Sequence, residues 1–468
     1  MRDPGSVFTE SVLGEPRQTA ELPLWAPAPA DSPAAWRRDA SVSLLQFKQH
    51  VAQVARRLPA GGAMINLCED RYSFLVAYAA AVGLRHTVLM PSSRAEQVLA
   101  ELQAAESNSY PCDDAMVEAA LADAVAGVPE SASSSVAGQV AGATVPAVHT
   151  AMIGFTSGST GQPKAFPKLW HSVSASTACN AAAIRRELDI DSTVRPWIVA
   201  TVPPQHMYGM ELSVLLPLLG GMAVHAGRPL FPADIAQALA EVPRPRLLVS
   251  TPVHLRAMVQ SSQEFPVADL IVSATAPMDA ALAAAVERKL GGRLLEMFGS
   301  TETCVFASRR TAVAAAWQLY EGVELQPVPE GTLVNAPWFT APMLLQDVVE
   351  LQGERCFLVR GRNSDLIEVA GKRASLADLT RRLLSIDGVQ DAVVFQPDHG
   401  AVATIRRVAA LVVAPGLTAA QVHDRLAASV DSAFMPRPLL VVESLPRNEL
   451  GKLPREVLLA QLQRLTRA

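Results

Sequence analysis

Residues 63–91 read AMINLCEDRYSFLVAYAAAVGLRHTVLMP, and this stretch decides the fold class. Residues 63–68 predict a short buried strand, residues 73–84 a mostly apolar helix, and residues 86–91 a second strand closed by a proline. A strand, a helix and a strand in this order are typical of parallel α/β layering. Upstream, helical spacing of apolar residues predicts a helix over 44–58, whereas the first forty residues, rich in proline and alanine, are expected to form loops.

The same alternation resumes downstream. Four apolar segments predict strands and helices: WIVATVPP at 197–204, RLLVSTPVHLRAM at 246–258, DLIVSATAP at 269–277 and RLLEMFGSTE at 293–302. Several of these predicted strands end in small or polar residues. In open α/β sheets, ligands bind outside the carboxyl ends of the strands, so we expect a ligand site there.

The character of the chain changes after FLVRGRNSD at 357–365. An amphipathic helix is predicted over 374–386, strands over 391–397 and 409–415, and a further helix over 420–430. About a hundred residues of this kind are long enough to fold as a small domain. We therefore predict a large layered α/β body with parallel sheets over residues 1–363 and a small α+β C-terminal domain over 364–468.

Composition narrows the class of protein. A chain of 468 residues is too long for one simple core, and its net charge of −5 argues against a nucleic-acid binder. The five cysteines are scattered without a C-x-x-C pair, which favours a reducing cytoplasm over a disulfide framework or a zinc site. The first residues lack a signal-peptide pattern, and the most apolar run, 212–224, is too short to span a bilayer. We expect a soluble, cytoplasmic protein.

The segment FTSGSTGQPKAF, residues 155–166, predicts a site for an anionic ligand. Gly158 and Gly161 let the backbone approach a ligand closely, and Lys164 adds a positive charge. Four neighbours add hydroxyl donors: Thr156, Ser157, Ser159 and Thr160. The P-loop pattern does not fit, because Lys164 stands three residues beyond Gly161 and Ala165 follows it. The alternative is an ordinary surface turn.

Five motifs in order make the chain resemble the adenylate-forming (ANL, AMP-binding) superfamily, which includes acyl- and aryl-CoA synthetases. They are TSGSTGQPK at 156–164, MFGSTET at 297–303, LLQDVVEL at 344–351, GRNSDLIEVAGKR at 361–373 and LPRNELGKLPREVL at 445–458. The resemblance covers residues 41–468. It implies the adenylate-forming enzyme fold with a mobile C-terminal lid, and a reaction in which a carboxylate attacks ATP to give an acyl-adenylate and pyrophosphate. A thiol then displaces AMP.

The resemblance also assigns nucleotide contacts. Residues 156–164 would hold the β- and γ-phosphates. Glu302 would bind Mg²⁺, and Thr301 would contact phosphate through its hydroxyl. The strand end at Phe298 and Gly299 would face adenine, with Phe298 stacking in place of the usual tyrosine. In the second half of the chain, Asp347 would accept hydrogen bonds from ribose and Arg362 would help to hold ribose and phosphate. Taken one by one, such residues are more often solvated surface acids or members of surface ion pairs.

The C-terminal motif supplies the remaining chemistry. Lys452 would place an ammonium between the carboxylate and the α-phosphate, where it offsets charge that develops in the transition state. Ser364 aligns with the hinge about which the C-terminal domain would rotate between the two half-reactions. Glu368 replaces the usual lysine and Ala165 the usual glycine, which leaves open whether the second half-reaction uses CoA.

The acid and the thiol remain open at this level. His206 matches a histidine beside the carboxylate in many relatives, and a lone histidine is otherwise more often structural. PPQHMYGME lacks the aspartate that amino-acid-activating domains usually carry here, which favours a plain acid, although Glu211 complicates this inference. The predicted acyl pocket fits an aromatic ring or a short acyl chain and comprises Met207, Tyr208, Ser273, Ala274, Thr275 and Ala276.

The chain further resembles the stand-alone acyl or aryl carrier-protein ligases of aryl-polyene and xanthomonadin pigment pathways. This resemblance implies a hydroxybenzoate-type acid, with the phosphopantetheine of an acyl carrier protein acting in trans as the acceptor. One alternative is an acyl- or aryl-CoA synthetase that uses free CoA. The other is a non-catalytic relative that only binds nucleotide.

Overall fold

The computed structural model describes residues 20–91, 94–125, 140, 143–156, 164–362, 366–369, 372–397, 408–447 and 453–467. Packing groups the chain into two compact units. Unit 1 comprises residues 1–315, 319–323 and 335–342, and unit 2 comprises residues 316–318, 324–334 and 343–468. The boundary predicted at 363/364 falls within unit 2, and the division into 1–363 and 364–468 stays a prediction.

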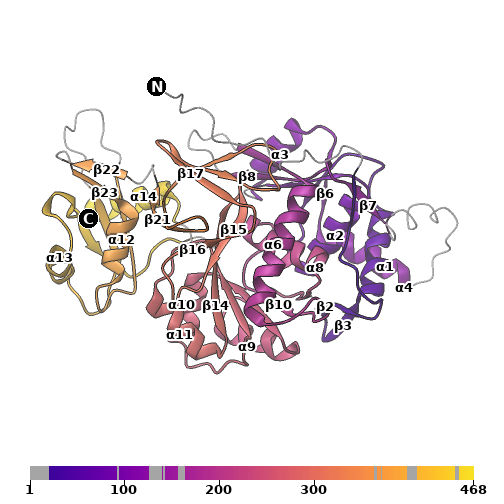
Figure 1. Ribbon diagram of the computed structural model, residues 1–468, viewed down its shortest axis with the longest axis horizontal. Helices are drawn as coiled ribbons and strands as arrows, with labels where there is room; N and C mark the ends of the chain where they lie inside the picture. The colour runs from indigo at the N-terminus through magenta and orange to yellow at the C-terminus, as the bar shows by residue number, and fades with distance from the viewer. Residues whose placement is uncertain are drawn as a thin grey trace. The chain divides into compact units, whose positions relative to one another are not determined.

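Unit 1 contains two layered sheets (Figure 1). In the smaller sheet four parallel strands lie side by side, and β9 joins their edge in antiparallel orientation. In order, its strands are β6 (Ser109–Cys112), β4 (Ala63–Asn66), β5 (Thr87–Met90), β8 (Thr150–Thr156) and β9 (Lys164–Leu169). The strands predicted over 63–68 and 86–91 are therefore confirmed as β4 and β5.

The larger sheet of unit 1 is also mainly parallel. Its strand order is β15 (Cys304–Arg309), β14 (Arg293–Ser300), β13 (Leu270–Ser273), β12 (Arg246–Ser250), β10 (Trp197–Ala200), β11 (Ala223–His225), β2 (Pro33–Arg37) and β3 (Ala40–Ser43). Strand β15 runs antiparallel to β14, and β3 runs antiparallel to β2. All four segments predicted to supply strands between residues 197 and 302 do so.

The expectation that the first forty residues form only loops was wrong. Strand β2 pairs in parallel with β11, and β1 (Glu21–Pro23) pairs with β7 (Thr144–Pro146). Trp36, at the end of β2, packs edge to face on Trp197 with ring centroids 6.4 Å apart. Pairing with distant strands overrides the local proline and alanine content, which only a tertiary contact can do.

Helices fill the spaces around these sheets. Helix α2 (Arg71–Gly83) begins at Asp70, whose side chain accepts a hydrogen bond from the Ser73 amide, and it is buried along almost its whole length. It contacts β4 and β5 of the smaller sheet and β11 of the larger one. Helix α6 (Trp170–Leu188) likewise contacts β9 on one sheet and β13 and β15 on the other. These two helices therefore lie between the sheets.

The remaining helices of unit 1 cover the outer faces of the sheets or belong to the segment 207–219, which contains Met207 and Tyr208 of the predicted acyl pocket. Three of them, α9, α10 and α11, bury apolar residues against β10, β12 and β13 in one core cluster. The bounds are α1 (Leu44–Ala55), α3 (Glu96–Ala105), α4 (Asp114–Val125), α7 (Met207–Met210), the π-helix η1 (Glu211–Leu215), α8 (Leu216–Leu219), α9 (Pro232–Glu241), α10 (Pro252–Gln260) and α11 (Ala280–Leu290).

Among its described residues, unit 2 contains short, mainly antiparallel sheets and three α-helices. Strand β21 (Cys356–Arg362) pairs with β16 (Trp317–Leu319) and with β20 (Asp347–Leu351). The C-terminal part has its own apolar core, in which α12, α13, β24 and β25 take part. The other elements are β17 (Glu324–Val328), β18 (Gly331–Asn335), β19 (Met343–Leu345), β22 (Leu366–Val369), β23 (Lys372–Ser375), α12 (Leu376–Leu384), β24 (Asp391–Phe395), β25 (Ala409–Val413), α13 (Ala419–Ala427), the 3₁₀ turn η3 (Ser432–Phe434), β26 (Leu439–Val441) and α14 (Arg455–Arg467).

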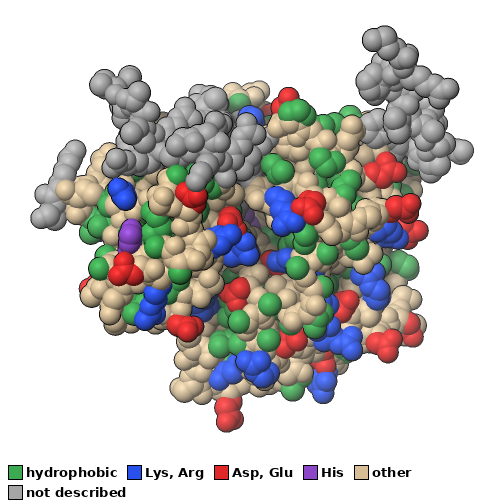
Figure 2. All heavy atoms as spheres, turned by 60° about the vertical axis from the view of Figure 1, so that its left-hand side comes forward, with side chains coloured by type: hydrophobic (Ala, Val, Ile, Leu, Met, Phe, Trp, Pro, Cys, Tyr) green, Lys and Arg blue, Asp and Glu red, His purple; other side chains and the backbone are tan. Residues whose placement is uncertain are grey.

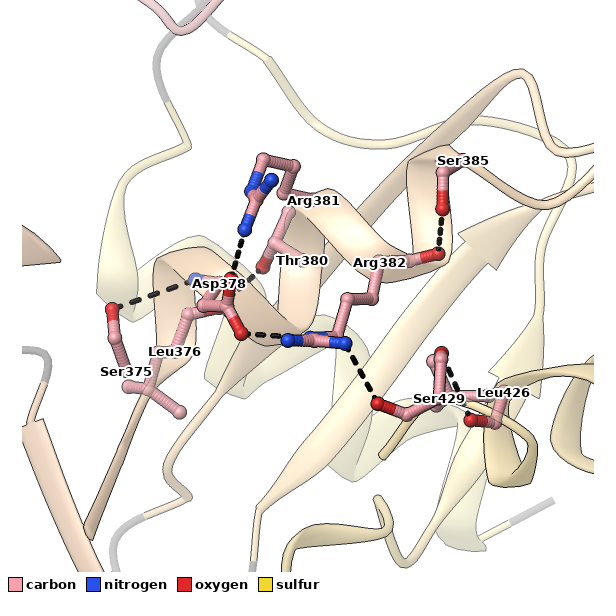
Figure 3. Close-up of polar contacts among 9 residues, drawn as sticks. All are labelled: Ser375, Leu376, Asp378, Thr380, Arg381, Arg382, Ser385, Leu426 and Ser429. Atoms are coloured by element: carbon pink, nitrogen blue, oxygen red, sulfur yellow. Dashed lines mark hydrogen bonds and ion pairs between the residues drawn. The ribbon is translucent and has the colours of Figure 1, made fainter. Parts of the chain in front are cut away.

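Helix α12 shows how local sequence specifies an element of unit 2 (Figure 3). Ser375 caps its first turn by accepting a hydrogen bond from the Asp378 amide. The Asp378 carboxylate pairs with Arg381 and Arg382 one turn later, and Arg382 also donates to the Ser429 carbonyl at 2.7 Å. The helices predicted over 374–386 and 420–430 are confirmed as α12 and α13.

The surface agrees with the composition. On the face drawn in Figure 2, basic and acidic side chains are interspersed. None of the helices in the described parts of the chain is long and apolar enough to cross a membrane.

Candidate active site

The predicted phosphate-binding loop connects two paired strands. Thr156, the last residue of β8, lies opposite Lys164, the first residue of β9, so the two ends of the loop meet at the edge of the smaller sheet. Lys164 is exposed at that edge. Residues 157–163 lie outside the described residues, and with them the predicted contacts of Ser157, Gly158, Ser159, Thr160 and Gly161. The hairpin therefore anchors both ends of the loop, with the ammonium of Lys164 at one of them.

A second hairpin carries Thr301 and Glu302. Strands β14 and β15 are joined by the turn at residues 301–303, and the backbone pairing shifts by a bulge between Phe298 and Gly299. Within the turn, the Ser300 amide donates to the Thr303 hydroxyl at 3.0 Å, and the Thr303 amide donates back to the Ser300 hydroxyl at 3.2 Å. This reciprocal bonding gives the turn a defined shape in which Thr301 and Glu302 stay partly exposed.

The two hairpins approach each other closely. A Cβ atom added to Gly154 in β8 would lie 3.2 Å from Cγ2 of Thr301, so the absence of a side chain at residue 154 allows this contact. Lys168 of β9 donates a hydrogen bond from Nζ to the backbone carbonyl of Glu302. The fold therefore brings the ends of the predicted phosphate loop and the predicted magnesium ligand to the same corner of unit 1.

Two residues, Cys304 directly after the 301–303 turn and Thr275 after β13, have uncommon backbone conformations. Cys304 has φ = 57°, and Thr275 has φ = 81°, which is rare for a β-branched residue. Such conformations cluster at functional sites, where the surrounding structure holds them. Phe298 packs edge to face on Phe306 with centroids 5.4 Å apart, which orients its half-buried ring.

The residues predicted to line an acyl pocket lie where α7 meets the ends of β12 and β13. His206 is half-buried and precedes α7, with Met207 and Tyr208 buried in its first turn. The Tyr208 hydroxyl lies 3.1 Å from the carbonyl oxygens of Ser250 and Val272, and burial raises its pKa well above the ordinary value. Its hydroxyl is therefore occupied by the strand ends, and Tyr208 offers a pocket mainly the face of its ring.

Strand β13 ends at the other predicted pocket residues. Ser273 is fully buried, and its hydroxyl has no hydrogen-bond partner among the described residues. Ala274 is buried, whereas Thr275 and Ala276 are half-buried. Because Ser273 pairs in register with Ser250 on β12, and Ser250 bonds to Thr201 at 3.0 Å, small hydroxyl residues line three adjacent strand ends.

Unit 2 carries the residues predicted to contact ribose. Asp347 is 7% exposed and lies directly opposite Arg362 in the β20–β21 ladder. The sequence placed these residues in separate motifs, and the antiparallel pairing makes them cross-strand neighbours. Ser364 and Lys452 lie outside the described residues.

Sequence reasoning did not predict that two charged residues of this region are buried. Lys168 is 5% exposed and Glu211 only 2% exposed, and both belong to the polar interior behind the Glu302 turn. The sequence carried one signal for Glu211, because a charged residue within an apolar run such as MELSVLLPLL is rarely buried without a partner. Only Glu211 was noticed, and only as a possible contact for an amino group.

The sequence model of the family described as "AMP-binding enzyme" matches residues 24–332. Among curated relatives, 4-coumarate–CoA ligase of Rhodobacter capsulatus is 31% identical over 240 residues, a match that covers 50% of this chain and 58% of that protein. A 3,4-dihydroxybenzoate–[aryl-carrier protein] ligase of Bacillus anthracis is 21% identical over 326 residues, covering 67% of this chain and 74% of that protein.

Solved structures share the fold. The o-succinylbenzoate–CoA synthetase of Bacillus subtilis superposes with a TM-score of 0.77 in its acyl-adenylate complex, at 17% identity, covering 94% of this chain and 98% of that one. The complex of that enzyme with ATP and magnesium gives a TM-score of 0.75 at 18% identity, covering 93% and 99%. The predicted fold, a layered α/β N-terminal part with a smaller C-terminal part, is thereby confirmed.

Proposed function

Because the chain belongs to the AMP-binding enzyme family of adenylate-forming enzymes, we propose that it activates a carboxylic acid with ATP. The carboxylate oxygen attacks the α-phosphate, pyrophosphate leaves, and an acyl-adenylate forms. A thiol sulfur then attacks the acyl carbon, a thioester forms, and AMP leaves. The first step brings two anions together, so its catalysis is mainly positioning and neutralisation of charge.

The observation that carries this proposal is the meeting of two hairpins in unit 1. Gly154 of β8 approaches Thr301, and Lys168 of β9 bonds to the Glu302 carbonyl. Lys164 at the start of β9 supplies an ammonium for the terminal phosphates. Cationic and hydroxyl groups near a carboxylate suit a magnesium–triphosphate ligand.

Magnesium fits the residues present. Glu302 is a partly exposed carboxylate on a well-defined turn, and the cation prefers one or two carboxylates together with phosphate oxygens. When bound, it would neutralise charge on the phosphates. Glu302 would hold it, while Thr301 would position a phosphate oxygen and residues 156–164 would hold the remaining ones.

We assign the binding of the acid to α7 and to the residues at the end of β13. A ring or short acyl chain would lie against Met207 and Tyr208, with Ser273–Ala276 along one edge and His206 near the carboxylate. The buried Ser273 hydroxyl, unsatisfied among the described residues and next in the chain to Val272, whose carbonyl accepts from Tyr208, favours an acid with a polar substituent such as hydroxybenzoate. The relative that acts on 3,4-dihydroxybenzoate supports the same class of acid.

For the acceptor we propose the phosphopantetheine of an acyl carrier protein acting in trans, as in the aryl-carrier protein ligase relative. Free CoA is the second candidate, favoured by the 31% identity to a 4-coumarate–CoA ligase. A place in a pigment pathway and a cytoplasmic location stay predictions from sequence. A relative that only binds nucleotide is the third reading, and the retained Lys164 and Glu302 weigh against it.

One experiment tests the function and names the acid. Purified protein is assayed for ATP–pyrophosphate exchange with a panel of hydroxybenzoates, cinnamates, short fatty acids and amino acids, with and without magnesium. We expect exchange with at least one aryl or short acyl acid and none without magnesium. Absence of exchange with every acid, together with tight ATP binding, would instead support the nucleotide-binding reading. Thioester formation from the best acid, with CoA and with a purified carrier protein compared side by side, then identifies the acceptor.

A further inference from the structure

Two buried charges lie behind the turn that carries Glu302, and neither is among the groups proposed to touch ATP or the acid. Lys168 comes from β9 and Glu211 from η1, two segments that are distant in the sequence. Both are at least nine-tenths buried. Buried charges are retained at a cost, because apolar residues of similar volume often serve stability as well or better. Their bonding partners show what they contribute.

Lys168 holds the Glu302 turn from the side of the β8–β9 hairpin. Its Nζ donates to the backbone carbonyl of Glu302. Because side chains alternate along a strand, Lys164 and Lys168 lie on the same face of β9. One strand therefore presents a lysine at the phosphate loop and, four residues later, a second lysine that fixes the backbone of the proposed magnesium ligand.

Glu211 holds the same hairpin from the side of the acyl pocket. Its Oε2 accepts hydrogen bonds from the Val305 amide at 3.0 Å, from Asn180 Nδ2 at 3.4 Å and from the Ser176 hydroxyl at 3.5 Å. Tyr320 in turn donates to Asn180 Oδ1 at 3.0 Å. Glu211 also belongs to a π-helical turn directly after α7, and such turns are frequent at functional sites.

The two charges also act on each other. Burial raises the pKa of Glu211 to about 7, while the Val305 amide and the positive charge of Lys168 lower it. Burial raises the pKa of the Cys304 thiol, and the charge of Lys168 lowers that pKa as well. Cys304, with its left-handed backbone, lies between the two groups that these side chains bond, the Glu302 carbonyl and the Val305 amide.

We propose that Lys168 and Glu211 are positioning residues that hold the 301–305 segment from both sides, so that the Glu302 carboxylate is presented to magnesium in a fixed geometry. Lys168 acts on the carbonyl of Glu302 itself, and Glu211 acts on the amide three residues later. This inference rests on the proposed function and extends it, since it couples the acyl-pocket helix to the metal site through one buried network.

The test separates positioning from stability with a double-mutant cycle. The variants are Lys168→Met, Glu211→Gln, the double variant, and Lys168→Arg as the conservative replacement. Lys168→Met removes the donor to the Glu302 carbonyl and leaves Glu211 buried without a nearby positive charge, so it should unfold at a lower temperature, whereas the double variant also removes the Glu211 charge and should regain part of the loss. The functional readout is the magnesium concentration that gives half-maximal pyrophosphate exchange.

We expect Lys168→Met and the double variant to need at least about tenfold more magnesium than the wild type for half-maximal exchange, as is usual for residues that orient metal ligands. Lys168→Arg should restore most of the wild-type magnesium requirement. Glu287→Gln is the matched control. Like Glu211, the Glu287 carboxylate accepts a hydrogen bond from a backbone amide of the β14–β15 hairpin, that of Leu294 at 2.7 Å, and it pairs with the cation of Arg310. These contacts lie at the end of the hairpin that is opposite to the Glu302 turn. This variant should lower the unfolding temperature without changing the magnesium requirement.

Two results would overturn the inference. One is a wild-type magnesium requirement in Lys168→Met, and the other is a double variant that regains both thermal stability and the wild-type requirement, since the network would then serve stability alone. If the wild type shows no exchange with any acid, the proposed function fails, and the inference is tested separately. Calorimetric titration with ATP at several magnesium concentrations should then still show about tenfold weaker magnesium-dependent binding in Lys168→Met.

Discussion

At the scale of single residues, the protein buries charged side chains in apolar surroundings, which disfavour the charged form. Glu211 is the clearest case, because its carboxylate is fully enclosed and bonded to one amide and two side chains. Burial raises the pKa of Glu211 from 4.5 to about 7, so the folded protein binds a proton there more tightly than the unfolded chain does. The stability that this proton contributes is fully present below pH 4.5 and is lost as pH rises through about 7.

We therefore expect the difference in unfolding free energy between wild type and Glu211→Gln to depend on pH. Relative to the variant, the wild type should lose stability as pH rises from about 4.5 to about 7, and the difference should level off above that range. Urea unfolding of both proteins at a series of pH values measures this difference, in which the titration of all other groups cancels. A difference that is constant across the range would show that the Glu211 carboxyl titrates normally.

At the scale of elements, the candidate active site depends on two hairpins whose close approach requires glycine at two positions. Gly154 permits the contact with Thr301, and Gly299 permits the bulged start of the β14–β15 turn. A Cβ atom at residue 299 would lie 2.1 Å from the Cys304 carbonyl oxygen, which is closer than two non-bonded heavy atoms can pack. The motif FGSTET therefore needs glycine at this point for the geometry of the hairpin.

Gly299→Ala should destabilise the protein by roughly 1–3 kcal/mol, the usual range for overpacking, and should lower exchange activity because the turn must shift. Thermal unfolding and the exchange assay measure the two effects. Gly61→Ala is the control, since no heavy atom lies within 4 Å of a Cβ there and its backbone needs no left-handed conformation. Equal unfolding temperatures for the two variants would contradict the steric argument.

At the scale of the whole molecule, the proposed chemistry needs residues from both parts of the chain. Unit 1 carries Lys164, Thr301 and Glu302, whereas unit 2 carries Asp347 and Arg362 as cross-strand neighbours. The proposed catalytic lysine, Lys452, and the proposed hinge, Ser364, belong to the C-terminal segment by sequence. Rotation of a C-terminal lid about residue 364 stays a proposal, and it makes a kinetic prediction.

Lys452→Ala should abolish acid-dependent pyrophosphate exchange, because the ammonium that offsets charge on the α-phosphate is removed. Thioester formation from chemically supplied acyl-adenylate should be largely spared, since a different face of the lid would serve that step. Measuring both half-reactions in one preparation tests the prediction, with Arg464→Ala, an exposed cation of α14, as the control. Equal loss of both steps would count against a role confined to adenylation.

The sequence by itself determined the local elements and the identity of the reactive groups. Alternation of apolar segments predicted β4, α2 and β5, and the ordered motifs pointed to Lys164 and Glu302, because periodicity and short motifs are properties of neighbouring residues. Helix α12 could likewise be predicted, since its cap and ion pairs are all local.

Only the tertiary structure decided which distant groups share an environment. It joined β2 to β11, set Asp347 opposite Arg362, and enclosed Lys168 and Glu211 on two sides of the Glu302 turn. These outcomes depend on strand pairing and burial between segments far apart in the chain, and one sequence carries no local signal for either. A lysine on a strand is ordinarily read as exposed, and it is the packing of β9 against the β14–β15 turn that turns this one inward.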